Sequence, residues 1–195
     1  IMRKKIFISS ILIVALLLLA ACSSNQDLGA SVEVEDQMEE NLVEKEELEY
    51  GIKINEDSVS FVDGRDKEVT ISKHPERVVV LFDSYLEVWC KSGGTVVGRL
   101  EAPPEKLVEE AKDAEPVGKL GAINVEKVLS LERVIMILSS NQKSQMELVP
   151  IFEENGIEII ALNYFVKDDY FRMVRLFTAI NEREDLYEEY AVKVR

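Results

Sequence analysis

The chain has 195 residues and a net charge of −14, from 37 acidic and 23 basic residues, which allows one domain with a sizeable core. An acidic excess of this size argues against nucleic-acid binding, because phosphate neutralisation needs clustered lysine and arginine. One histidine, His74, and two cysteines, Cys22 and Cys90, supply no set of metal ligands, so we expect no metal site.

The N-terminus has the pattern of an export signal. A basic start at residues 3–5 is followed by an apolar stretch over 11–21, which is too short to span a membrane as a helix. The sequence Leu19-Ala20-Ala21-Cys22 resembles the lipobox of bacterial lipoproteins. This resemblance implies a signal peptide over 1–21, lipidation of Cys22, and anchoring to the outer face of the cytoplasmic membrane. The alternative is a non-lipidated signal followed by a coincidental cysteine.

Residues 22–57 are expected to form a disordered linker after the lipidated cysteine. The stretch 23–50 is rich in Asp and Glu, has Lys45 as its one basic residue, and contains no aromatic residue before Tyr50. Such a segment buries too little apolar surface to fold alone. A marginal helix over 34–48 and, less favoured, an acidic binding site are the other interpretations.

The folded domain is predicted to begin at residue 58 with a β-hairpin. Apolar residues alternate at Val59 and Phe61 and again at Val69 and Ile71, around the turn sequence 63–66. Four short apolar runs then follow, at 78–81, 95–98, 134–138 and 157–162. Runs of this kind are typical of strands that are buried on both faces.

Amphipathic patterns predict helices between and after the apolar runs, over 84–92, 104–112, 125–131, 144–155 and 168–180. Alternating strands and helices indicate an α/β fold, here a Rossmann-like lobe with a parallel sheet flanked by helices. Cys90 falls on the inner face of the first helix and is expected to be a buried, unreactive thiol. A last helix is predicted from Glu184 through Arg195 without a stop signal, so we expect the natural chain to continue.

The sequence contains no dinucleotide fingerprint, Walker loop, serine-hydrolase motif or paired histidines, so we do not expect an enzyme. In open α/β sheets, ligands bind beyond the carboxyl ends of the strands. The candidate ligand-binding residues at these ends are Phe82, Asp83, Ser84, Tyr85, Arg99, Glu101, Lys119, Ser140, Asn141, Tyr164 and Phe165. Their aromatic rings suit a bulky, partly apolar organic ligand.

Several of these candidates also have a purely structural interpretation. Ser84 is a good N-cap for the predicted helix, and Phe82 and Tyr85 are as well explained by core packing. Arg99 can pair with an anionic group of a ligand, or instead with Glu101 or Glu105.

Residues 58–194 resemble the N-terminal lobe of the substrate-binding lipoproteins that serve ABC importers of iron-siderophores, cobalamin and haem. Four segments match the family patterns in order, namely 63–71 with 75–81, then 87–98, 117–131 and 181–184. The chain departs from these patterns at Arg133, where the family has Pro-Asp, and near Asn181, where a glycine is missing. The resemblance implies an N-terminal lobe over 58–182 and the start of an inter-lobe helix over 183–195, with the second lobe missing.

The resemblance further implies a monomer without a cofactor that captures a metal chelate, above all an iron-siderophore. Haem stays possible because Tyr85 and Tyr164 can serve as axial ligands. Glu126 occupies the family position that faces the ABC permease, and it is also an acid favoured in the first turn of a helix. The alternatives are a lipid-anchored protein-interaction or sensor module, and an enzyme that reuses the fold.

Overall fold

The computed structural model describes residues 49–195. The predicted signal peptide, the lipidation at Cys22 and the linker up to residue 48 lie outside the described residues. In the part of the chain that is described, no helix has the length and apolar character needed to cross a membrane.

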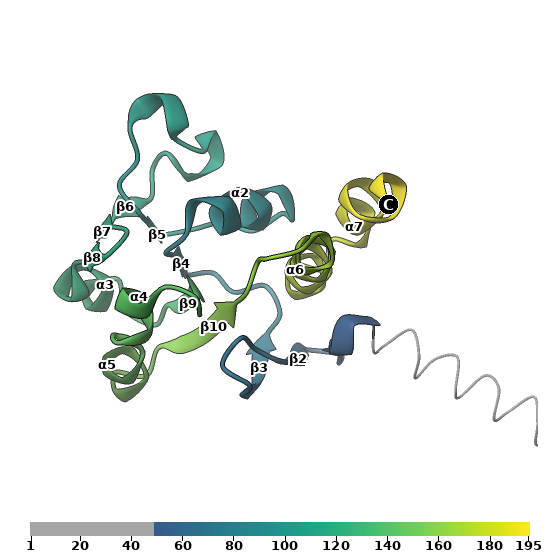
Figure 1. The fold of residues 1–195 in the computed structure, drawn as a ribbon, viewed down its shortest axis with the longest axis horizontal. Coiled ribbons are helices and arrows are strands. Elements are labelled where there is room, and N and C mark those ends of the chain that lie inside the picture. Colours follow the sequence, from purple (N-terminus) through teal and green to yellow (C-terminus); the bar gives the residue numbers. More distant parts are fainter. Residues whose placement is uncertain (1–48) are drawn as a thin grey trace, which may run out of the picture. The chain divides into compact units, whose positions relative to one another are not determined.

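A five-stranded parallel sheet forms the centre of the fold (Figure 1). Its strand order is β10-β9-β4-β5-β6. The strands are β4 (Val78–Val80), β5 (Gly98–Arg99), β6 (Glu115–Pro116), β9 (Ile135–Ser139) and β10 (Glu158–Leu162). The predicted Rossmann-like α/β lobe is therefore confirmed. The run predicted at 95–98 contributes only its last residue to β5, and β6 has no counterpart in the prediction.

Both faces of this sheet are covered, because successive side chains of a strand point to opposite faces. In β4, Val78 and Val80 belong to a buried cluster with residues of α2 (Asp83–Lys91) and α6 (Lys167–Ile180). Val79 belongs to a second cluster with residues of α3 (Val125–Ser130) and α5 (Val149–Glu154). The apolar runs at 78–81, 134–138 and 157–162 were predicted as strands buried on both faces, and this prediction is confirmed, whereas the run at 95–98 is mostly a half-buried loop.

Two of the helices predicted between the apolar runs differ from the observed ones. The helix predicted at 144–155 is split into α4 (Lys143–Met146) and α5, since Pro150 lies in the first turn of α5 and cannot continue a preceding helix. The helix predicted at 104–112 is wrong. That segment forms two 3₁₀ turns, Pro104–Lys106 and Glu109–Ala111, in which Ala111 is the one buried residue, so there is no apolar stripe to pack a helix.

The predicted hairpin is confirmed as β2 (Ser58–Val62) paired antiparallel with β3 (Glu68–Ser72). A further strand, β1 (Lys53–Ile54), pairs with β2 and follows a 3₁₀ turn at Glu49–Gly51. Ile52 is buried in the same cluster as Val59 and Phe61. The ordered fold therefore begins before the predicted boundary at residue 58.

The turn of the β2–β3 hairpin covers the edge strand β10. Gly64 donates its backbone N–H to the Ala161 carbonyl at 2.7 Å, and the fully buried carboxylate of Asp63 accepts the Ala161 N–H at 3.3 Å. A side chain on Gly64 would place its Cβ 2.6 Å from Ser140 Oγ and 3.2 Å from the Ala161 carbonyl oxygen, so this close approach favours glycine. The hairpin thus pairs backbone groups that an edge strand otherwise exposes.

The C-terminal helix is shorter than predicted. α7 covers Glu184–Tyr190 and is followed by a 3₁₀ turn at Val192–Val194. The Tyr187 hydroxyl donates to Glu49 Oε2 at 2.7 Å, and Arg195 pairs with Glu49 Oε1 at 3.0 Å. Burial and the neighbouring carboxylate of Glu49 raise the pKa of Tyr187 well above its usual range. These contacts join the last residues of the chain to the segment that precedes β1.

Candidate ligand-binding site

The carboxyl ends of the five parallel strands lie along one edge of the sheet. The chain passes from β4 to β5 and β6 on one side, and later forms β9 and β10 on the other side of β4. β4 and β9 are therefore neighbours at a topological switch point, where ligand crevices form in open α/β sheets. The predicted site residues follow the strands at this edge, so the topology brings their loops together.

Gln145 bridges the ends of β4 and β9, and sequence reasoning missed it. Its side chain is fully buried, Oε1 accepts the Ser139 N–H at 2.9 Å, and Nε2 donates to the Leu81 carbonyl at 2.5 Å. The Ser139 N–H and the Leu81 carbonyl lie at the ends of their strands, and these two bonds to Gln145 supply each with a hydrogen-bond partner. No local pattern could have revealed this role, because both partners of the amide lie on other elements.

The residues after β4 divide between the surface and the core. Asp83 is exposed, whereas Phe82 and Ser84 are half-buried. α2 begins at Asp83, so Ser84 lies inside its first turn and the N-cap interpretation of Ser84 is wrong.

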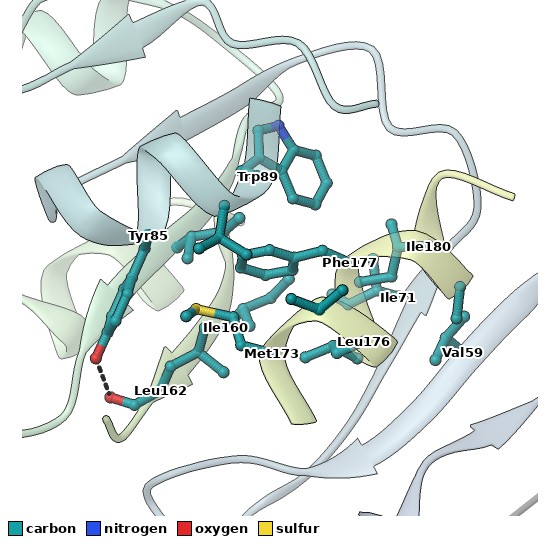
Figure 2. Packing of buried hydrophobic residues seen from close by; sticks show 14 of the residues in the cluster. Val59, Ile71, Tyr85, Trp89, Ile160, Leu162, Met173, Leu176, Phe177 and Ile180 are labelled. Carbon is teal, nitrogen blue, oxygen red and sulfur yellow. Dashed lines mark hydrogen bonds between the residues drawn. The ribbon is translucent and has the colours of Figure 1, made fainter. Parts of the chain in front are cut away.

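Tyr85 is buried, and its hydroxyl donates to the Leu162 carbonyl at 3.2 Å (Figure 2). Burial raises the pKa of its phenol. The structure therefore favours the packing interpretation of Tyr85, which ties α2 to the end of β10.

Arg99 is directed into the protein rather than toward the strand-end surface. Its Nε donates to the Ala111 carbonyl at 2.9 Å, and its two terminal nitrogens donate to Leu100 at 3.0 Å and Lys112 at 3.4 Å. Only 8% of the residue is exposed. Within residues 49–195, the guanidinium forms neither of the acid pairs considered from the sequence, and it holds the 111–112 loop against β5.

Glu101 and Lys119 are brought together by a small hairpin that was not predicted. Strands β7 (Gly118–Lys119) and β8 (Ala122–Ile123) form this hairpin, and Gly118 accepts the Glu101 N–H at 2.7 Å. Lys119 Nζ lies 3.8 Å from Glu101 Oε2, and both side chains are exposed. The two candidates therefore form a surface ion pair beside the end of β5.

The loops after β9 and β10 are joined, and they present aromatic rings to the surface. The Ser140 hydroxyl bonds to the Leu162 carbonyl at 3.2 Å and to the Asn163 side chain, while Asn141 is exposed. Tyr164 is 43% exposed and Phe165 is 73% exposed.

The backbone that carries these rings is fixed at the start of α6. Asp169 Oδ2 accepts the backbone N–H groups of Phe165 at 2.7 Å and Val166 at 3.0 Å. Val166 is itself exposed, so the three residues 164–166, called here the aromatic loop, form an ordered apolar surface.

Glu126 lies exposed in the first turn of α3. Asn124 caps this helix by accepting the Lys127 N–H at 3.0 Å. Glu126 forms no ion pair with the residues that the structure describes. This placement suits the carboxylate for stabilising the helix N-terminus and leaves it accessible from outside.

Two features elsewhere in the lobe lie apart from the predicted candidates. A hollow of about 420 Å³ lies at the opposite edge of the sheet, where residues 72–77 precede β4, and none of the predicted site residues lines it. Cys90 is half-buried, and burial with a contribution from Glu110 raises the pKa of its thiol to about 11. A thiol with this pKa is almost fully protonated at neutral pH.

The strand-end surface offers aromatic rings, hydroxyl and amide groups, and carboxylates. These groups suit non-covalent binding of a partly apolar ligand. In residues 49–195, no group of three or more His, Cys, Asp or Glu side chains is placed to hold a metal ion. Fold and site together have the character of one lobe of a binding protein.

The chain was compared with protein families, curated proteins and solved structures. No protein-family model matches the chain. The chain is 26% identical over 165 residues to YvrC of Bacillus subtilis, described as an uncharacterized ABC transporter substrate-binding lipoprotein. This match covers 83% of the chain but 46% of YvrC, so the chain spans about half the length of its curated relative.

Solved structures of binding proteins share the fold. The petrobactin-binding protein YclQ of Bacillus subtilis matches with a TM-score of 0.61 and 20% identity, over 71% of this chain and 50% of YclQ. Staphylococcus aureus SirA, solved with staphyloferrin B, matches with a TM-score of 0.54 and 21% identity, over 69% of this chain and 47% of SirA. The resemblance to substrate-binding lipoproteins of ABC importers is confirmed, in sequence by YvrC and in fold by these structures.

Proposed function

We propose that the chain is the N-terminal lobe of an extracytoplasmic substrate-binding protein that captures a metal chelate, above all an iron-siderophore, for an ABC permease. The observation that carries this proposal is the exposed aromatic loop beside the β4–β9 switch point, on a fold shared with YclQ and SirA. The lobe covers 58–182 together with the preceding residues that pack on it, and the ligand lies against the strand-end loops. Glu126 faces the permease.

Among metal chelates, haem is less well supported than a siderophore. Of the two tyrosines considered as axial ligands, Tyr85 is buried and donates its hydroxyl to the Leu162 carbonyl. Tyr164 is 43% exposed. An iron-siderophore brings its own oxygen ligands and requires only a complementary surface.

Ligand capture is tested by calorimetric titration of the chain with ferrioxamine B, ferrichrome, ferric enterobactin, haem and cobalamin. We expect one ferric siderophore class to bind. We expect the double variant Tyr164→Ala/Phe165→Ala to weaken that binding roughly tenfold or more, because exposed aromatic rings supply much of the contact energy in such sites. Ile151→Ala, which truncates an exposed apolar residue on α5, is the matched control and should bind normally. Absence of binding by every compound would favour the protein-interaction module instead.

Membrane attachment through Cys22 is tested separately in bacterial cells. We expect Cys22→Ala to move the protein from the membrane fraction to the soluble extracytoplasmic fraction, because the body of the chain carries a large net negative charge and anionic lipid repels it. Cys90→Ala removes the only other cysteine and should leave the protein in the membrane fraction. Membrane retention of Cys22→Ala would contradict the lipid anchor.

A further inference from the structure

The β2–β3 hairpin closes the edge of a neighbouring strand but leaves its own edge open. Within residues 49–195, β3 pairs with β2 on one side and with no strand on the other. The outer edge of β10, which has the same length, is closed by the turn residues 63–65 through bonds to Ala161 and Ile159. β3 contains no proline and its register with β2 is regular, so neither device that commonly protects an edge strand is present.

The backbone groups on this open edge belong to Glu68, Thr70 and Ser72. At the two ends of the ladder, the Lys67 carbonyl accepts an N–H from residue 63 at 2.9 Å, and the Lys73 N–H donates to residue 57 at 3.0 Å. Hydrogen-bonded and non-hydrogen-bonded pairs alternate along an antiparallel ladder, so every second residue between these ends bonds to β2. The three intervening residues direct their N–H and C=O groups outward, and no other group in 49–195 bonds to them.

A hollow lies along the open edge, between β3 and β10 (Figure 1). It has a volume of about 230 Å³, and apolar side chains of Val69, Ile71, Ile157 and Ile159 contribute to its lining. The hollow of about 420 Å³ described above adjoins it, since Glu158 lines both. An extended peptide with alternating apolar residues matches this arrangement, because it offers backbone groups at the spacing of a strand and apolar side chains on one face.

The charged side chains of the smaller hollow leave a surplus of acid. Arg65 and Lys67 both pair with Glu153, at 2.7 Å and 3.3 Å. Glu68 and Glu158 also line this hollow, and neither forms an ion pair with any residue of the described chain. The larger hollow, beyond the end of β3, has further charged residues in its lining, namely Lys73, His74, Glu76, Arg77 and Arg133. Beside the middle of β3, a basic side chain is therefore attracted and an acidic one repelled.

We infer that the open edge of β3 binds an extended peptide segment of a partner protein, which adds a strand beside β3 and places a lysine or arginine against Glu68 and Glu158. A second copy of the chain fits this edge less well, because the net charge of −14 makes copies repel each other. A five-residue edge also buries far less than the roughly 1,200–2,000 Å² of a stable interface. The edge is separate from the strand-end surface, so the inference goes beyond ligand capture.

The test is calorimetric titration of the chain with the blocked peptide Val-Thr-Val-Lys-Val-Thr-Val, together with backbone hydrogen exchange followed by NMR. We expect the peptide to bind and to slow exchange of the Glu68, Thr70 and Ser72 N–H groups, because these become hydrogen-bonded. The same peptide with glutamate in place of its lysine should bind about threefold to tenfold more weakly at low salt.

Thr70→Pro removes one outward N–H without removing a bond to β2, a position at which edge strands accept proline. We expect it to weaken binding of the lysine peptide at least fivefold. Thr70→Ala keeps the N–H and is the matched control, with binding unchanged within about twofold. The double variant Glu68→Gln/Glu158→Gln leaves the backbone intact, so it decides the matter if Thr70→Pro does not fold, and it should bind the lysine peptide about threefold to tenfold more weakly.

Absence of binding, binding without protection of the three N–H groups, or equal binding of the lysine and glutamate peptides overturns the inference. A dimer in analytical ultracentrifugation that the peptide dissociates would instead make a second copy the occupant, and this also overturns it. None of these results bears on ligand capture, which is tested through Tyr164 and Phe165 at the opposite edge of the sheet.

Discussion

Replacing Asp63 with alanine is expected to lower the free energy of unfolding by about 3–5 kcal/mol, the usual effect of removing one partner of a buried ion pair. The Asp63 carboxylate is fully buried and lies 2.7 Å from Arg65 Nε. It also accepts the backbone N–H groups of Arg65 at 2.9 Å and Ala161 at 3.3 Å. Truncation leaves these donors without their partner and loosens the hairpin from β10.

The measurement is urea denaturation followed by circular dichroism, with two companion variants. Asp63→Asn keeps an acceptor oxygen but loses the charge, so its cost should be smaller, about 1–3 kcal/mol. Asp57→Ala removes an exposed acid near the start of the same hairpin and should change the stability by no more than about 0.5 kcal/mol. Equal stability of the Asp63→Ala and Asp57→Ala variants would show that the hairpin turn does not anchor the edge strand.

The second large effect is expected at Trp89. Trp89→Ala should lower the free energy of unfolding by about 3–5 kcal/mol. The indole is fully buried, donates to the Thr95 carbonyl at 2.9 Å, and packs edge-to-face on Phe177 with ring centres 5.0 Å apart (Figure 2). Alanine therefore leaves a large cavity between α2 and α6 and an unpaired carbonyl. Thermal unfolding of the two proteins measures the difference.

Gly94 provides an independent check, because the indole lies directly against it. A Cβ on Gly94 would be 2.2 Å from Trp89 Cε2, so Gly94→Ala should cost about 1–3 kcal/mol by overpacking. In the Trp89→Ala variant the indole is gone, so a Cβ at position 94 meets no ring. Gly94→Ala should then lower the free energy of unfolding only slightly. Additive costs in the double variant would contradict a direct steric fit between these two residues.

The two adjacent glycines after α2 are needed for different reasons, and only one reason is local. A glycine directly after a helix commonly takes a left-handed backbone conformation, and Gly93 has such a positive φ of 85°. Gly94 is needed for a different reason, the approach of Trp89, which depends on how α2 folds against the following loop. A local pattern identifies a backbone conformation, whereas a steric fit needs the three-dimensional arrangement.

In the candidate site, too, the sequence predicts the position of a residue along the chain, whereas its contacts depend on the folded structure. The sequence placed Tyr85, Arg99 and Tyr164 at strand ends, and the parallel sheet brings those ends to one edge. It could not show which of these side chains face outward. Tyr85 and Arg99 donate to carbonyls inside the fold, while Tyr164 is exposed. For Tyr85 the carbonyl is on Leu162, far along the chain, so no local pattern contains that information.

The sequence by itself determined the strands β2, β3, β4, β9 and β10, most of the helices and the parallel α/β class, because buried strands and amphipathic helices have local periodicities. Only the tertiary structure decided how the hairpin turn covers β10, how Gln145 joins β4 to β9, and which charges remain available at the strand ends. These features depend on contacts between distant segments. The tertiary structure therefore turned Arg99 into the fold and left the rings of the aromatic loop exposed at the strand-end surface.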